Sequence, residues 1–164
     1  MCAGIAGNTV AWLFSRAFVK NTFVVGDISI SLTETTGDEY KLIPGVSIAK
    51  DPTVTIHSGS ESCWVFIKIE ESGNLGDYVT YSLAEGWSEL EDGVYYREYT
   101  IRHENVVYPV LKNNSVTVKD TVTESEENYL KEEGITPGLR FTAYAVQRVG
   151  FNLAYDAWQE AKKQ

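Results

Sequence analysis

Apolar and polar residues alternate at every second position through the middle of this chain, and this pattern limits the fold more than any other feature. Ile28, Ile30 and Leu32 are separated by serines. Successive side chains of a strand point to opposite faces, so the alternation predicts strands with one buried face. The other runs of this kind are TVTIH at 53–57, CWVFIKIEE at 63–71, GVYYREYTIR at 93–102, NVVYPVL at 105–111, SVTVKDTV at 115–122 and LRFTAYAVQ at 139–147.

Turn-forming clusters separate these runs, among them TTGDE, IPG, KDP, SGSES, SGNLGD, EDG, KNN and TPG. Short strands punctuated by such turns are typical of a β-sandwich or a β-barrel. Pro109 cannot donate a backbone hydrogen bond, so NVVYPVL is expected at a sheet edge or a bulge.

Two segments break the alternation and predict short helices. TESEENYLKEEG begins with Thr123 and Glu126 at capping-box spacing and ends at Gly134. FNLAYDAWQEAKKQ, at 151–164, places Phe151, Ala154, Trp158 and Ala161 on one face. We therefore expect a surface helix near residue 123 and an amphipathic helix at the C-terminal end.

Length and charge narrow the class of protein. A chain of 164 residues is large enough for one domain with its own hydrophobic core. Its formal charge of −9 would repel a phosphate backbone, which argues against a nucleic-acid partner. The sequence has no apolar run of about 18 residues, so we expect no membrane span.

Residues that could carry catalysis are sparse. Neither of the two histidines, His57 and His103, lies in an HExxH motif, and no GxSxG, CxxC, GxGxxG or calcium-binding loop occurs. Cys63 stands at the start of an apolar strand, where a small buried side chain is the simplest interpretation. His57 falls on the polar face of its strand and is expected to be solvated. We therefore expect no enzyme activity, no cofactor and no metal site.

The N-terminal stretch AGIAGNTVAWLFSRAFVKNTF, at 3–23, is unusual in an acidic chain because residues 10–25 contain no acidic side chain. Thr9 and Ala11 are small residues at the spacing that a signal peptidase prefers. We interpret residues 1–11 as the remnant of a signal peptide. Residues 12–21 then form a separate N-terminal segment, and the sandwich domain extends over residues 22–164.

Several segments together resemble the camelysin and TasA-like family of secreted biofilm-matrix fibre proteins of Gram-positive bacteria, in particular its clostridial members. NTFVVGDISISL is similar to the segment that follows the signal in that family, and YKLIPGVSIAKDPTVTIHSGSESCWVFIKIEE has the same order of turns and strands. FTAYAVQRVGFNLAYDAW resembles the closing strand and C-terminal helix. WLFSRAFVKNTF departs from the family pattern, since it is more apolar and more basic than the family's acidic segment.

The resemblance implies a mainly β fold: a jelly-roll-like antiparallel β-sandwich with one or two short peripheral helices. It also implies export and assembly into extracellular filaments, in which each subunit donates an N-terminal strand to its neighbour. The partners would be other copies of this chain, with the cell wall or other matrix components as further candidates. Carried over to this sequence, the donor strand comprises Val10, Trp12, Leu13, Phe14 and Phe18, and the hinge comprises Val19, Lys20 and Asn21.

Two alternative functions, and one alternative place for the N-terminal strand, stay open on sequence grounds. The first is a monomeric secreted or wall-associated binding module that uses exposed aromatic residues such as Trp87, Tyr95 and Tyr96. The second is a camelysin-like protease, for which the chain offers no recognisable metal or nucleophile motif. The apolar N-terminal strand could also fold back into its own sheet, as a simple part of the core.

Overall fold

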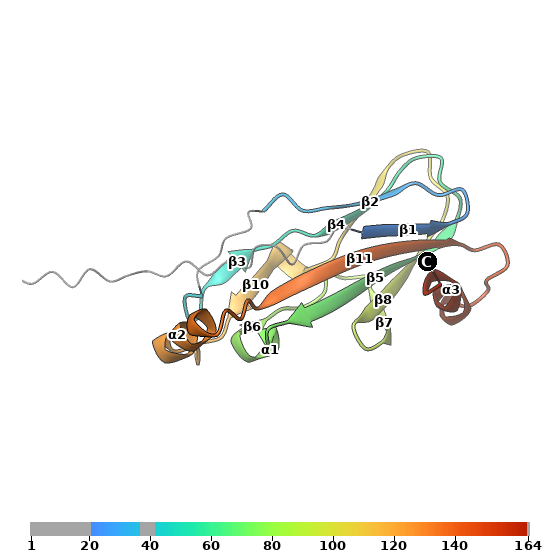
Figure 1. Ribbon diagram of the computed structural model, residues 1–164. Helices are drawn as coiled ribbons and strands as arrows, with labels where there is room; N and C mark the ends of the chain where they lie inside the picture. Colours follow the sequence, from blue (N-terminus) through green and yellow to red (C-terminus); the bar gives the residue numbers. More distant parts are fainter. Residues whose placement is uncertain (1–20, 37–41, 164) are drawn as a thin grey trace, which may run out of the picture.

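In the computed structural model, residues 21–36 and 42–163 are described, and they form a two-layered β-sandwich with three short helices (Figure 1). The strands are β1 (Asn21–Val25), β2 (Ile30–Thr33), β3 (Ser47–Ala49), β4 (Thr53–Ile56), β5 (Cys63–Ser72), β6 (Val79–Thr80), β7 (Ser88–Glu91), β8 (Val94–Tyr99), β9 (Val106–Pro109), β10 (Ser115–Val118) and β11 (Gly138–Gln147). The helices are α1 (Leu75–Tyr78), α2 (Glu124–Glu132) and α3 (Ala154–Ala161), with a 3-10 turn at Lys112–Asn114. The expected mainly β sandwich with a C-terminal helix is confirmed.

The first layer is a five-stranded sheet in the order β1-β11-β5-β8-β7. Its pairs are antiparallel except for β1 and β11, which run parallel with Asn21 opposite Thr142. The two long central strands, β5 and β11, pair over their whole length. They form the longest pair of strands in the sandwich, and the other elements are arranged along them.

The second layer consists of two three-stranded sheets, β2-β4-β9 and β3-β10-β6. Two short connections join these two sheets. β3 leads into β4 through residues 50–52, and β9 leads toward β10 through the 3-10 turn. Backbone bonds bridge the break: Val110 N donates to Pro52 O at 2.9 Å, and Lys50 N donates to Asn114 O at 2.7 Å. The second layer is therefore close to one kinked sheet. Pro109 ends β9, which pairs only with β4 within its sheet and so holds the expected edge position.

The main core lies between the layers and follows the alternation in the sequence. In β5 the odd positions Cys63, Val65, Ile67 and Ile69 belong to this core. The even positions Trp64 and Phe66 point to the outer face of the same sheet and join a second apolar cluster. Beyond them the outer face becomes charged, which explains why β5 begins apolar on both faces and ends amphipathic.

Helix α3 covers that second cluster. Trp158 is 2 % exposed, and its ring centroid lies 5.3 Å from that of Phe66 and 5.0 Å from that of Tyr144. Its indole Nε1 donates to Glu91 Oε1 at 2.7 Å, so the polar group of this buried side chain is satisfied. The expected apolar face of the C-terminal helix is confirmed.

Helix α2 begins as its sequence predicts. Glu126 N donates to Thr123 Oγ1 at 3.3 Å, and Thr123 N donates to Glu126 Oε2 at 2.8 Å, which completes a capping box. Gly134 follows the helix with φ of 65°, a left-handed conformation that glycine adopts without steric cost.

Candidate functional site: an open edge of the sandwich

Along one edge of the first layer, the described residues of β1 lie beside only part of β11. β1 pairs with residues 142–146 of β11, whereas residues 138–141 of β11 pair with β5 alone among the described strands. Figure 1 shows β1 beside only the C-terminal half of β11, while the N-terminal half continues toward the end where α2 lies. Within the described part of the chain, residues 138–141 thus form an open sheet edge.

The backbone at this edge points outward. Ile69 N donates to Gly93 O at 2.8 Å, so the backbone polar groups of Ile69 face β8 and not β11. In an antiparallel ladder the residue opposite then directs its own N–H and C=O away from the pair. Phe141 lies opposite Ile69, and Leu139 lies opposite Glu71 at the same parity. The N–H and C=O groups of Leu139 and Phe141 therefore point toward the open edge.

The side chains of Leu139 and Phe141 point out of the plane of the sheet, into the core. Leu139 is 2 % exposed and Phe141 is 3 % exposed, and both belong to the main apolar cluster. The outward side chain between them, Arg140, is exposed. The edge thus combines a row of backbone hydrogen-bonding groups with a buried apolar floor, which is the arrangement that a further strand can extend.

The second layer is also short at this end. β2 pairs with β4, whereas β3 pairs with β10 and has no second partner among the described strands. β2 packs against both β1 and β11, so the short edges of the two layers lie on the same side of the sandwich. Both open edges lie toward the α2 end (Figure 1).

A buried ion pair lies beside this opening. Lys50 Nζ is 2.5 Å from Glu34 Oε1, and the two side chains are only 3 % and 6 % exposed. Lys50 follows β3 and Glu34 follows β2, so the pair joins the two segments where each leaves its sheet. The ammonium group also lies 5.9 Å from the ring centroid of Phe141. The ion pair is therefore close to a side chain that forms the floor of the open edge.

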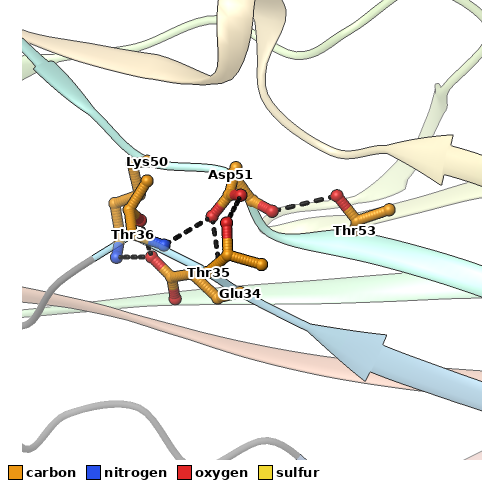
Figure 2. A network of polar contacts seen from close by, with 6 residues as sticks. All are labelled: Glu34, Thr35, Thr36, Lys50, Asp51 and Thr53. Atoms are coloured by element: carbon orange, nitrogen blue, oxygen red, sulfur yellow. Dashed lines mark hydrogen bonds and ion pairs between the residues drawn. The ribbon is translucent and has the colours of Figure 1, made fainter.

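Asp51 forms a second set of contacts at the same point (Figure 2). Its Oδ1 accepts from Thr35 N at 2.8 Å and from Thr36 N at 3.0 Å, and its Oδ2 accepts from the Thr35 hydroxyl. Partial burial alone would raise the pKa of this carboxyl. The hydrogen bonds from Thr35 and Thr36 outweigh it and lower the pKa from 3.8 to about 2.

Together these contacts fix the point at which the second layer ends. Thr53 Oγ1 donates to Asp51 O at 2.9 Å, and Thr36 Oγ1 donates to Glu34 Oε1 at 3.1 Å, so the network spans the end of β2 and the start of β4 (Figure 2). We call residues Glu34, Thr35, Thr36, Lys50, Asp51 and Thr53 the rim network. It holds the chain in a defined path beside the open edge of β11.

Most of the expected assembly residues lie outside the described residues. These are the donor residues Val10, Trp12, Leu13, Phe14 and Phe18, and the hinge residues Val19 and Lys20, together with the proposed signal remnant at 1–11. Asn21, which we counted with the hinge, is the first residue of β1 and pairs with Thr142. The described part of the sheet thus includes one residue before the expected start of the sandwich domain, and this residue lies beside residue 142 of β11.

The sequence did not single out the rim network or the open edge. KDP, at 50–52, predicts a turn and belongs to a segment that resembles the family, but nothing in those letters shows that Lys50 is buried. The sequence offers one clue. Glu34 follows a clear strand pattern and Asp51 precedes one, and a turn is expected at each place. Pairing them with a lysine and two threonines required the three-dimensional structure.

The aromatic residues considered for a binding surface do not converge. Tyr95 packs against the main core, whereas Tyr96 packs on the outer cluster, with its ring 5.9 Å from that of Trp64. Trp87 lies at the other edge of the layers, where Arg97 Cζ is 5.2 Å from its ring and 3.9 Å from the ring of Tyr108. These three side chains therefore do not form a shared platform for a ligand.

Cys63 and His57, two of the groups that could support catalysis, make structural contacts. Cys63 is buried, and burial raises the pKa of its thiol to about 12, so a reactive thiolate is disfavoured. His57 is half-buried, and its Nε2 lies 3.1 Å from Ser31 Oγ, which makes it less solvated than expected. Among the described residues no cluster of histidine, cysteine, aspartate or glutamate could hold a metal ion.

No helix in the described ranges has the length and apolar character needed to cross a membrane.

Comparison with known proteins adds no assignment to this geometry. The chain matches no protein-family model, no curated protein and no solved structure in these comparisons.

Proposed function

We propose that this chain is a secreted structural protein, the subunit of an extracellular filament that grows head to tail by donation of an N-terminal strand. The observation that carries the proposal is the open edge at residues 138–141, where the backbone groups of Leu139 and Phe141 face outward. A strand added there would pair with those outward-facing backbone groups and extend the sheet. In this proposal the added strand comes from the next subunit.

The donor is the apolar N-terminal segment. Val10, Trp12 and Phe14 recur at every second position, so in an extended strand they share one face. Leu13 lies on the opposite face. Phe18 lies on the same face as Val10, Trp12 and Phe14, at the C-terminal end of the donor segment. Such a strand would place large apolar side chains against the sandwich while its backbone pairs with β11.

Donation between identical subunits produces an open polymer. The donor segment and the acceptor edge are different surfaces of the molecule, so each added subunit exposes a new edge for the next one. The formal charge of −9 disfavours non-specific association of monomers. Strand pairing and apolar contact would then be the main attractive contributions, and added salt should accelerate growth by screening the repulsion.

A competing possibility follows from the register of β1. If the pairing of Asn21 with Thr142 continued toward the N-terminus in parallel, residues 17–20 of the same chain would lie opposite residues 138–141. The edge would then be closed within one molecule, and a monomeric secreted or wall-associated module would result. Any experiment on assembly has to separate these two outcomes.

A charge placed on the donor face separates them. We would compare the unmodified full chain with the double variant Trp12→Asp/Phe14→Asp and with Ser15→Asp, which adds charge on the opposite face of the same segment. Electron microscopy and size-exclusion chromatography would measure assembly, and thermal unfolding would measure folding. We expect filaments from the unmodified chain and from Ser15→Asp, and folded monomers from the double variant.

Two results would count against the proposal. If the unmodified chain stays monomeric at high concentration and at moderate salt, donation between subunits does not occur. If the double variant is strongly destabilised as a monomer, the apolar segment belongs to its own core.

A further inference from the structure

Strand β9 lies at an edge of the second layer, and one hydrogen bond fixes the direction of its backbone groups. Val110 N donates to Pro52 O at 2.9 Å, so the N–H of Val110 points toward the β4 side. Alternation along an antiparallel ladder then directs the groups of Tyr108 toward β4, and those of Val107 and Pro109 away from it. The outer edge of β9 would therefore present Val107 and Pro109 to an incoming strand.

Neither backbone group of Pro109 is available to such a strand. Proline has no N–H, so one donor is absent from the outer edge of β9. The carbonyl oxygen of Pro109 accepts a hydrogen bond from Trp87 Nε1 at 2.9 Å. The ring of Trp87 packs against the main core, which holds the indole N–H in this position. At Pro109 the edge of β9 is thus closed to both donors and acceptors of another strand.

The chain segment 79–87 covers the same edge over a longer distance. At its start, β6 pairs with β10. Residues 82–84 then bond residues 110–112 through two backbone hydrogen bonds of 2.9 Å each, and Trp87 ends the segment beside β9. Within the described part of the chain, the outward backbone groups of Val107 are what remains uncovered along β9.

Arg97 supports this cover from between the two layers. Its Cζ lies 5.2 Å from the ring of Trp87 and 3.9 Å from the ring of Tyr108, and the two rings meet edge to face. Gly86, with φ of 90°, leaves room for the guanidinium, because a β-carbon at that position would overlap it. None of the ion pairs among the described residues includes Arg97. A strand that covered this edge would further desolvate an unpaired charge, which is unfavourable.

The neighbouring edge of the first layer is closed by other means. β7 consists of four residues, carries Glu89 and Glu91, and shows a register shift between them. Short strands, charges, bulges and proline are devices that prevent pairing between sheet edges. By contrast, β11 pairs with β5 without a register shift, and residues 138–141 contain neither proline nor an acidic residue. The closing devices thus lie on the β7 and β9 side, opposite the open edge of β11.

We propose that Trp87, Arg97 and Pro109, which we call the edge guard, close the β9 edge to strand addition and thereby confine strand donation to β11. The closure is a property of the folded subunit and does not depend on a filament. Its consequence for growth rests on the proposed function. A subunit with one acceptor edge and one donor segment extends a polymer in a single line, without branches.

Opening the β9 edge tests the closure without relying on polymerisation. The starting protein is the full chain carrying Trp12→Asp/Phe14→Asp. In the opened variant, Pro109→Thr restores an outward N–H, and Trp87→Phe frees the carbonyl of residue 109 while an aromatic ring stays in place. Size-exclusion chromatography with light scattering should show a mass that rises with concentration toward that of a dimer, at moderate salt to screen repulsion. Amide exchange at Val107 should slow in parallel. The starting protein should remain monomeric.

A matched control makes the same kinds of change without opening the edge. Trp64→Phe removes the hydrogen bond from the indole Nε1 to Phe151 O, and Val107→Thr adds a threonine to β9 without a new backbone donor. This control should remain monomeric. Thermal unfolding would establish that all variants are folded. Pro109→Thr alone keeps every contact of Trp87 and should show the same changes to a smaller extent, so a folding defect of the opened variant would not decide the outcome.

The outcomes separate the closure from the filament. An opened variant that stays monomeric with unchanged exchange at Val107 would overturn the proposal, as would equal association of the opened and control variants. With an unmodified donor segment, the opened variant should form branched or laterally joined filaments, and unbranched filaments would contradict the confinement to β11. If the unmodified chain forms no filaments while the opened variant still dimerises, the closure of β9 stands and the proposed function fails.

Discussion

Replacing Asp51 by Asn should weaken the rim network in a pH-dependent way. The carboxylate accepts hydrogen bonds from Thr35 N, Thr36 N and the Thr35 hydroxyl, and these bonds lower its pKa from 3.8 to about 2. Taken in full, that shift corresponds to roughly 2 kcal/mol, at about 1.4 kcal/mol for each pKa unit. Asp51 keeps partial contact with solvent, so we expect about 1 kcal/mol after screening.

The sign of the pH dependence follows from the lowered pKa. The folded state holds the charged carboxylate more favourably than the unfolded state does, so the stabilisation is complete above pH 3.8 and is lost as the pH falls through about 2. The free energy of unfolding of Asp51→Asn should therefore lie about 1 kcal/mol below that of the unmodified chain at pH 7 and at pH 5. The difference should narrow at pH 2.5.

Urea denaturation followed by tryptophan fluorescence would measure this difference, since the unfolding free energy falls linearly with urea concentration. Glu104→Gln removes a carboxylate from an exposed loop and serves as the matched control. A double-mutant cycle with Thr35→Val would isolate the contact with the Thr35 hydroxyl, and we expect a coupling of at least about 0.5 kcal/mol. A deficit in Asp51→Asn that stays constant between pH 7 and pH 2.5 would refute the reasoning, because it would then arise from packing and not from the charge.

Two further predictions concern the core. Trp158→Ala should lower the free energy of unfolding, measured by urea denaturation, by about 3 to 5 kcal/mol. The substitution empties the space between Phe66 and Tyr144 and removes the hydrogen bond to Glu91. A loss below about 1 kcal/mol would show that α3 is not anchored there. In a Cys2→Ser variant, which leaves Cys63 as the single thiol, Cys63 should resist Ellman's reagent at pH 8 in the native protein and react fully in denaturant, because burial raises the pKa of its thiol to about 12. Rapid native labelling of that variant would contradict its buried position.

The sequence predicts those parts of the fold in which local pattern and tertiary burial agree. β4, β5, β10 and β11 follow their alternation, and α2 follows its capping box, because in each case neighbouring residues carry the information. β7 was missed, since its sequence SELE is polar on both faces of an edge strand. α1 begins at a left-handed Asn74 and is a single turn, too short to produce a helical period.

The features of the candidate site depend on contacts between distant residues. The parallel pairing of β1 with β11 brings together segments about 120 residues apart, and no local pattern specifies its register. Lys50 is buried only because Glu34 and Phe141 are brought to it, and in the sequence it cannot be distinguished from a lysine of an exposed turn. The open edge among the described residues likewise follows from the register of β1 against β11, which no local pattern in the sequence specifies.

Amide hydrogen exchange at Leu139 and Phe141 tests the proposed donation between subunits most directly. Both N–H groups point away from β5 toward the open edge, so their protection reports whether a further strand is bound there. We predict rapid exchange at both residues in the monomeric Trp12→Asp/Phe14→Asp variant and strong protection in filaments of the unmodified chain. Equal and strong protection in both forms would contradict this account, because it would show that the edge is already closed within the monomer.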